Sequence, residues 1–256
     1  MSTRVAIVDL DGTVYRGGSL IPGADRGIER LREAGYELRF VSNSPTDSPA
    51  AYARKLRGMG IDVAAEHVVS SGAATTAALR ERHPDGAVFL VGSTGLETQL
   101  RDGGVDLTDD PPAADALVVS WDSAFGYDDM VDALAVPEGV PFYGTDPDRT
   151  YPTESGGIEP GSGAVIGAVA ATVGRNPDAV FGKPSLDLFE QAVGDADPAD
   201  CLVVGDRLST DIEMGERAGA RTVLVRSGVT DGDALEASDR RPDHVIGGLA
   251  DIGSIL

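Results

Sequence analysis

Residues 4–13 read RVAIVDLDGT, and this stretch decides the fold class. Its first six residues form a short apolar run rich in Val and Ile, which is typical of a buried strand in a parallel sheet. Asp9 ends the run, and Asp11 follows two residues later, so both carboxylates point the same way at a strand end, where open α/β sheets bind ligands. Two converging carboxylates invite a divalent cation or a shared proton. Gly12 and Thr13 then allow a tight turn, whose N–H groups we expect to face an anion.

The segments around this stretch alternate strand-like and helix-like blocks, which predicts a parallel sheet covered by helices. Strands are expected at 4–9, 37–42, 67–71, 179–181, 201–205, 222–225 and 244–246. Helices are expected at 24–34, 47–59, 73–82, 185–193 and 210–218. Residues 83–175 are richer in turns and hold further strand candidates. The sequence therefore predicts an α/β fold: a doubly wound parallel sheet formed by 1–82 and 176–256, with a smaller α/β domain at 83–175 inserted into it.

The charge of the chain excludes several classes of function. The 256 residues carry 42 acidic and 21 basic side chains, a formal charge of -21. Such a surface repels nucleic acids and anionic membranes, and no apolar run approaches the roughly 18 residues that span a bilayer. The N-terminal residues lack a signal-peptide pattern, so we expect a cytoplasmic protein. The acid excess also suggests salt adaptation; a GC-rich genome would explain the preference for Arg over Lys, but not the charge.

Two further blocks place polar side chains near strand ends. Ser42 ends the expected strand at 37–42 within FVSNSP (40–45), where its hydroxyl could hold a phosphate oxygen; the alternative is an ordinary turn that begins a helix. Lys183 stands in FGKP and is one of only two lysines beside 19 arginines. A compact ammonium at this place suggests a geometric demand that the broad Arg fork does not meet. The other lysine, Lys55, is interpreted as a surface residue.

The block 202–212, LVVGDRLSTDI, supplies two more carboxylates. Asp206 follows a buried strand, and Asp211 lies where a helix is expected to start. Asp211 could merely stabilise that helix end, and Asp206 could be a loop acid. Beside Asp9 and Asp11, however, Asp206 would be a third strand-end carboxylate and would complete an oxygen-ligand site of the kind that Mg²⁺ prefers.

Together these four blocks, in this order and spacing, resemble the haloacid dehalogenase (HAD) superfamily. The longer strings DLDGTVYRGGSLIPGA, FVSNSPT, FGKPSLDLF and VGDRLSTDIEMGERAGARTVLV resemble its para-nitrophenyl phosphatase branch, which includes NagD-like phosphatases. The resemblance covers nearly the whole chain. It implies a Rossmann-like core and an α/β cap domain, because the branch carries a cap at the position of the insert.

The resemblance also implies roles for single residues. Asp9 would be the nucleophile that forms an aspartyl-phosphate, and Asp11 would be the general acid and base. Ser42 and Lys183 would hold the phosphoryl group, with Lys183 also neutralising charge on Asp9. Substrate binding would further involve the turn at Gly12 and Thr13 and the strand-end residue Asn43.

The implied cofactor is Mg²⁺. Asp9, Asp206 and the backbone carbonyl of Asp11 would bind it, and Asp211 would support the metal or orient Lys183. An acid at position 11 favours a phosphatase over a dehalogenase, because an alkoxide leaving group needs a proton and a halide does not.

The expected function is hydrolysis of a small phosphorylated metabolite, with neither nucleic acid nor membrane as partner. A phosphotransferase with the same intermediate and a non-catalytic phosphate-binding protein remain as alternatives. Nucleoside monophosphates, phosphoglycolate, glycerol phosphate and sugar phosphates are all open as substrates. The resemblance also implies a homo-oligomer formed through the cap.

Overall fold

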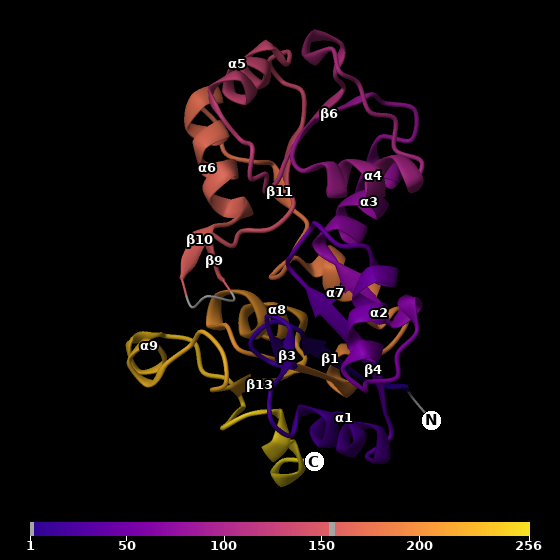
Figure 1. Cartoon of the computed structure of the whole chain (residues 1–256), viewed down its shortest axis with the longest axis vertical. Coiled ribbons are helices and arrows are strands. Elements are labelled where there is room, and N and C mark those ends of the chain that lie inside the picture. Colours follow the sequence, from indigo (N-terminus) through magenta and orange to yellow (C-terminus); the bar gives the residue numbers. More distant parts are fainter. Residues whose placement is uncertain (1–2, 154–156) are drawn as a thin grey trace. The chain divides into compact units, whose positions relative to one another are not determined.

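The computed structural model describes residues 3–153 and 157–256, and these form two compact units (Figure 1). The first, called the core unit here, comprises Met1–Ser42, Pro49–Val69 and Lys183–Leu256. The second, the inserted unit, comprises Asn43–Ser48 and Ser70–Gly182. These packing units begin and end at other residues than the domains expected at 1–82, 83–175 and 176–256, and that domain division stays a prediction.

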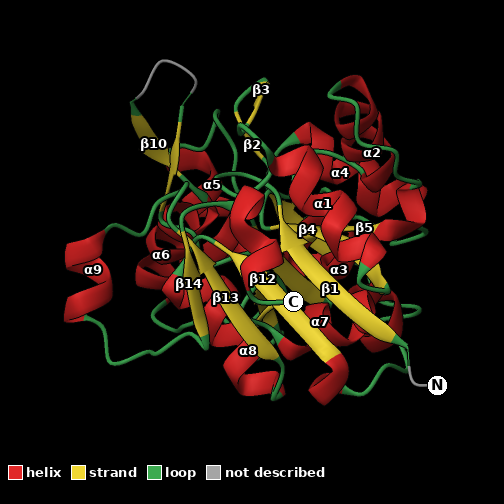
Figure 2. Ribbon diagram, turned by 90° about the horizontal axis from the view of Figure 1, so that it is seen from below, coloured by secondary structure: helices red, strands yellow, loops and turns green. Residues whose placement is uncertain are grey.

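A six-stranded sheet forms the centre of the core unit (Figure 2). In spatial order its strands are β14 (His244–Ile246), β13 (Arg221–Val225), β12 (Cys201–Gly205), β1 (Arg4–Asp9), β4 (Tyr36–Ser42) and β5 (Val68–Ser70). The pairings of β1 with β4 and β12, of β12 with β13 and of β13 with β14 are parallel. The chain builds outward from β1 in one direction and from β12 in the other. The strand order thus reverses between β1 and β12, where sheets of this type bind ligands.

Helices cover both faces of this sheet. The core-unit helices are α1 (Ala24–Glu33), α2 (Pro49–Gly58), α7 (Leu186–Val193), α8 (Glu213–Ala218) and α9 (Gly232–Ala237), and a short hairpin joins β2 (Tyr15–Arg16) to β3 (Ser19–Leu20). Side chains alternate along a strand, so Ala6 and Val8 of β1 face one side, where they share a buried cluster with Ile28 of α1 and Leu56 of α2. On the other side, α7 packs on β1 and β4, and α8 on β12 and β13. The predicted doubly wound fold is confirmed.

The inserted unit has its own parallel sheet, with the order β11 (Ala179–Val180), β8 (Phe142–Gly144), β7 (Ala116–Val119) and β6 (Val88–Val91). Its helices are α3 (Ser71–Arg82), α4 (Thr94–Asp102), α5 (Tyr127–Ala135) and α6 (Ser162–Val173). The apolar side chains of β7, α5 and α6 gather around the fully buried Phe142. The expected second α/β unit is therefore present.

Two local expectations differ from the structure. The strand expected at 179–181 in the core sheet is wrong: β11 pairs with β8, in the register Ala179 to Tyr143, because the chain is still part of the inserted unit there. The turn-rich segment after residue 145 also forms an antiparallel pair, β9 (Thr150–Pro152) with β10 (Ile158–Pro160), which the sequence pattern did not indicate.

Across the described residues, every helix is either too short or too polar to cross a bilayer.

Candidate active site

Three neighbouring strands of the core sheet end in polar side chains. Asp9 is the last residue of β1, Ser42 is the last residue of β4, and Asp206 directly follows β12. Because β4, β1 and β12 are adjacent and parallel, their carboxyl ends meet at one edge of the sheet. Asp9 and Asp206 are buried there, 6% and 1% exposed.

Lys183 joins two of the site's carboxylates. Its Nζ donates to Asp9 Oδ1 at 2.5 Å and to Asp211 Oδ1 at 2.7 Å. The lysine is 3% exposed, so this is a buried ion-pair network rather than a surface salt bridge. In such surroundings a charge is stable only when it is paired and hydrogen-bonded, which these contacts provide.

The side chains of Asp9, Asp206 and Asp211 also offer ligand atoms to a metal ion. One carboxylate oxygen of each lies within 4.8 Å of the others. Asp9 Oδ2 is buried and has no hydrogen-bond partner among the described residues. When all are ionised, three carboxylates and one ammonium leave two negative charges, which a divalent cation would balance. The donor set therefore fits a hard divalent cation, which prefers carboxylate oxygens.

Burial and mutual repulsion raise the pKa values of two acids in this cluster, Asp9 and Asp206. Burial raises the pKa of Asp9 well above its ordinary value; Lys183 opposes the rise, and Asp211 and Asp206 add to it. Burial and the neighbouring Asp211 raise the pKa of Asp206 to about 6. Burial disfavours the charge of Lys183, but Asp211 and Asp9 outweigh that effect and hold the pKa of its ammonium above its usual range. Lys183 thus stays protonated among acids that need further positive charge.

Backbone N–H groups bond to one oxygen of Asp206 and one oxygen of Asp211. Asp206 Oδ2 accepts the N–H of Val229 at 2.6 Å. Asp211 lies in the π-helical turn Leu208–Ile212, and its Oδ2 accepts the N–H of Arg207 at 3.2 Å. In Asp211 the backbone bond uses the oxygen that Lys183 does not contact.

A tight turn after β1 lets the backbone approach Asp206. Gly12 has a φ of 91°, and a Cβ there would lie 2.5 Å from Asp206 Oδ2, so only glycine fits. The N–H groups of Gly12 and Thr13 donate to Tyr15 O and Leu10 O. Both N–H groups are used within the turn, and the predicted contact of Gly12 and Thr13 with the substrate stays a prediction. The hydroxyl of Thr13 is buried without a hydrogen-bond partner among the described residues.

Asp11 stands apart from the buried cluster. The residue is exposed, and its carboxyl group is not part of the cluster of Asp9, Asp206 and Asp211. Partial burial of the carboxyl still raises the pKa of Asp11, against the opposing charges of Lys55, Arg207, Arg16 and Lys183. Its predicted metal contact through the backbone carbonyl stays a prediction.

Ser42 and Asn43 belong to different packing units. Ser42 Oγ is buried and donates to the hydroxyl of Tyr52 at 3.3 Å. Asn43 lies in the inserted unit, where its Nδ2 donates to Asp148 Oδ2 at 3.3 Å and its carbonyl accepts from Ser71 Oγ at 2.6 Å. The predicted substrate contact of Asn43 stays a prediction.

Two residues of α2 near the site were missed from the sequence. Tyr52 bonds to Ser42, and Lys55, interpreted above as a surface residue, is half-buried with its Nζ 3.8 Å from the centroid of the Tyr15 ring. The signal that could have identified Lys55 is the one that singled out Lys183, the scarcity of lysine in this chain.

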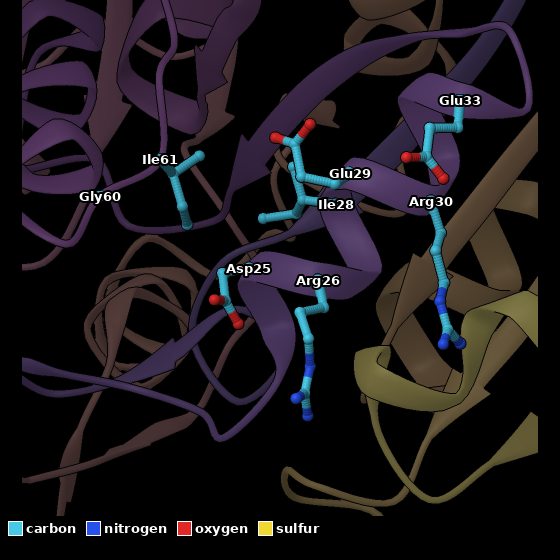
Figure 3. Close-up of a pocket in the computed structure, with 8 residues that line it drawn as sticks. All are labelled: Asp25, Arg26, Ile28, Glu29, Arg30, Glu33, Gly60 and Ile61. Atoms are coloured by element: carbon cyan, nitrogen blue, oxygen red, sulfur yellow. The ribbon is translucent and has the colours of Figure 1, made fainter.

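A pocket of about 400 Å³ lies along α1, apart from these residues. Its lining is mostly charged, and Figure 3 shows it as side chains of α1 with Gly60 and Ile61 beside them. None of the predicted site residues lines it, so it is not the candidate active site.

Known proteins share this architecture. Residues 6–106 match the family model of haloacid dehalogenase-like hydrolases, and residues 180–252 match the HAD-hydrolase-like model. The sugar-phosphatase AraL of Bacillus subtilis (strain 168) is 34% identical over 96% of this chain and 90% of its own length. Chronophin of Rattus norvegicus is 34% identical over 96% of this chain and 85% of its own.

Solved structures agree with these relatives. The p-nitrophenyl phosphatase from Archaeoglobus fulgidus superposes with a TM-score of 0.91 at 33% identity, covering 99% of this chain and 100% of that one. NagD from E. coli K-12 gives a TM-score of 0.86 at 29% identity, covering 98% and 99%. The chain belongs to the haloacid dehalogenase-like hydrolases. The expected placement in the p-nitrophenyl phosphatase and NagD-like branch, as an enzyme of the HAD phosphatase type, is confirmed.

Proposed function

We propose that this protein is a Mg²⁺-dependent phosphatase of small phosphomonoesters that works through an aspartyl-phosphate on Asp9. The observation that carries the proposal is the buried cluster of Asp9, Asp206 and Asp211, two of which contact Lys183, at the point where the strand order reverses. The relatives named above as sugar phosphatase and p-nitrophenyl phosphatase support the substrate class.

Asp9 has the surroundings of a nucleophile. Lys183 holds its Oδ1, while Oδ2 is buried with no hydrogen bond from the described residues. In the first step a carboxylate oxygen of Asp9 forms a bond to phosphorus, and the bond from phosphorus to the ester oxygen breaks. In the second step water attacks the phosphorus, inorganic phosphate leaves, and the Asp9 carboxylate is regenerated.

Asp11 would move the protons of both steps. It follows the nucleophile by two residues and is exposed, so its carboxyl can reach the ester oxygen of a bound substrate. It would give its proton to the departing alkoxide and then take one from the attacking water.

The other members of the site would position charge. Asp9, Asp206 and Asp211 would hold Mg²⁺, with the backbone carbonyl of Asp11 as a further ligand. When bound, Mg²⁺ supplies positive charge that neutralises the phosphoryl oxygens. Lys183 would do the same from the protein side, and Ser42 would turn its O–H from the Tyr52 hydroxyl to a phosphoryl oxygen.

The domain at 83–175 would act as a cap whose loops select the substrate. A cap that excludes bulk water would strengthen the electrostatic contacts to the phosphoryl group. We also propose a cytoplasmic location and contacts between copies through this domain, which would make the enzyme a homo-oligomer.

An assay of inorganic phosphate from p-nitrophenyl phosphate tests the function, with and without Mg²⁺ and with and without an acceptor alcohol. We expect Mg²⁺-dependent phosphate release that matches nitrophenol release. More nitrophenol than phosphate in the presence of the alcohol would show a phosphotransferase instead. Binding of phosphate without turnover would show a non-catalytic protein.

A further inference from the structure

Lys55 is an ammonium group placed against the loop that carries Asp11. It projects from α2 and lies with its Nζ 3.8 Å from the centroid of the Tyr15 ring. Tyr15 is 2% exposed and closes the loop, since its carbonyl accepts the N–H of Gly12 at 2.8 Å. The ring face attracts the cation and fixes where it stands. Lys55 therefore has a defined position beside this loop.

The two lysines of the chain differ in how they are paired. Lys183 contacts two carboxylates, whereas the described part of the chain gives the ammonium group of Lys55 neither a hydrogen bond nor an ion pair. The chain holds 42 acidic residues, yet no carboxylate of the described residues forms an ion pair with this half-buried ammonium. Its three N–H donors are available to a ligand, apart from their contact with the ring.

Several cations act on the carboxyl group of Asp11, although the net charge of the protein is negative. Asp11 experiences the attraction of Lys55 most strongly, followed by Arg207 and Arg16. These three cations come from α2, from the loop after β12 and from β2. Arg16 already donates to the carbonyl of Ser227. Lys55 is thus the cation near Asp11 that has no acceptor within the described residues.

We propose that Lys55 binds a second anionic group, carried by the leaving-group part of the substrate. The inference rests on the proposed function, because it needs Asp11 at the ester oxygen. The alcohol that departs from that oxygen must lie beside Asp11 and so within the field of Lys55. Esters whose alcohol carries a carboxylate or a second phosphate are then preferred over esters of neutral alcohols.

Matched substrates test this preference. Phosphoglycolate carries a carboxylate, 2-hydroxyethyl phosphate is its neutral counterpart, and ethylene glycol bisphosphate carries a second phosphate. We compare kcat/KM at low, constant ionic strength with saturating Mg²⁺ for the native enzyme, Lys55→Gln and Lys55→Arg. Arg54→Gln is the control, because Arg54 is the exposed neighbour on the same helix and its loss changes the net charge equally.

We expect Lys55→Gln to lower kcat/KM on an anionic ester about tenfold or more, mainly by raising KM. This is the effect of losing one charged hydrogen bond. On the neutral ester it should stay within about twofold, as should Arg54→Gln on all esters. Lys55→Arg should recover part of the loss because it keeps the charge. A loss of kcat/KM on phosphoglycolate alone would mean that Lys55 binds a carboxylate. A loss of kcat/KM on both anionic esters would mean that Lys55 binds anionic groups in general.

Equal losses on charged and neutral esters, or no loss, would overturn the inference. So would a native enzyme that prefers the neutral ester. Hydrolysis of p-nitrophenyl phosphate by the native enzyme separates this failure from failure of the proposed function. Thermal melts of each variant show whether a loss comes from unfolding instead, and Lys55→Arg then carries the comparison.

Discussion

Two regions of the molecule bury carboxylates, and they do so in opposite ways. In the core unit, Asp9, Asp206 and Asp211 converge, Lys183 contacts Asp9 and Asp211, and one oxygen of Asp9 is left without a hydrogen bond from the described residues. In the inserted unit, Asp146 is 2% exposed, and the described residues give it no ion pair.

Local donors take the place of a cation at Asp146. Its Oδ2 accepts from the Thr145 hydroxyl at 3.2 Å, its Oδ1 accepts the N–H of Asp148 at 3.2 Å, and the Ser162 side chain also bonds to it. Burial and the nearby Asp148 raise the pKa of Asp146 to about 7. The comparison teaches that burial of an acid alone does not mark a reactive site. The core cluster differs in having a buried ammonium and an oxygen without a partner.

The largest expected difference in activity lies between two variants, each of which has one acid of one cluster replaced by its amide. Asp9→Asn should lose at least about 10⁴-fold in kcat, because an amide cannot form the phosphoryl intermediate and loss of a nucleophile has effects of this size. Asp146→Asn should change kcat less than about twofold, since the residue takes no part in the proposed chemistry. Phosphate release from p-nitrophenyl phosphate measures both. Comparable losses in the two variants would remove the distinction between the clusters.

Removing the buried cation should have the next largest effect, on stability. Lys183→Met leaves Asp9 and Asp211 buried without their ammonium, and breaking a buried pair in this way costs about 3–5 kcal/mol. Lys55→Met is the matched control, because it removes the other lysine, which lies only on an aromatic face and should contribute about 1 kcal/mol. Urea unfolding in the absence of divalent metal gives both values. Lys55→Met as destabilising as Lys183→Met would contradict the pairing argument.

Mg²⁺ should stabilise the protein by binding to the cluster of Asp9, Asp206 and Asp211, and Asp146 should contribute nothing to this effect. At a Mg²⁺ concentration of about 100 times Kd, ligand linkage adds about 2.7 kcal/mol, so the Tm of the native protein should rise by about 5 °C or more. Asp206→Asn should lose most of this response, because it removes one of the three converging carboxylates. Asp146→Asn should keep it. Calorimetry with added Mg²⁺ and with chelator provides the test, and an unchanged response in Asp206→Asn would exclude Asp206 as a ligand.

The ionisation of Asp146 should instead make the free energy of unfolding depend on pH. A pKa raised to about 7 means that the folded state favours the protonated acid, so its contribution to stability is lost as pH rises from about 4 to about 7. Asparagine does not ionise, so Asp146→Asn should gain on the order of 2 kcal/mol relative to the native protein between pH 5 and pH 8. Urea unfolding at the two pH values measures the gain. A difference that does not grow with pH would mean that Asp146 is ionised without penalty.

Much of the core site follows from the sequence because parallel strands bring their carboxyl ends to one edge. Asp9 and Asp206 each end a short apolar run, so their meeting needs only the predicted sheet. The signal that identifies Lys183 is the scarcity of lysine in the chain. The contacts of Lys55 and Tyr52 depend on which face α2 turns to the sheet, and a motif does not show this.

Short elements were less predictable. The two residues of β11 carry no periodicity that assigns them to one sheet, and the register with β8 decides the matter. The pairing of β9 with β10 is similarly hidden by turn-forming residues. Salt adaptation, expected from the acidic composition, stays a prediction; a Tm that rises with KCl would support it.

The central claim is that Asp9 becomes phosphorylated during turnover. The direct measurement is rapid quenching of Asp11→Asn during reaction with p-nitrophenyl phosphate, followed by peptide mass spectrometry. This variant still has the nucleophile but lacks the base for the second step, so the intermediate should accumulate. The account predicts one added phosphoryl group on the peptide that contains Asp9, and none in the double variant that also carries Asp9→Asn. Turnover with no phosphoryl group at Asp9, or with the group on another residue, would contradict the account.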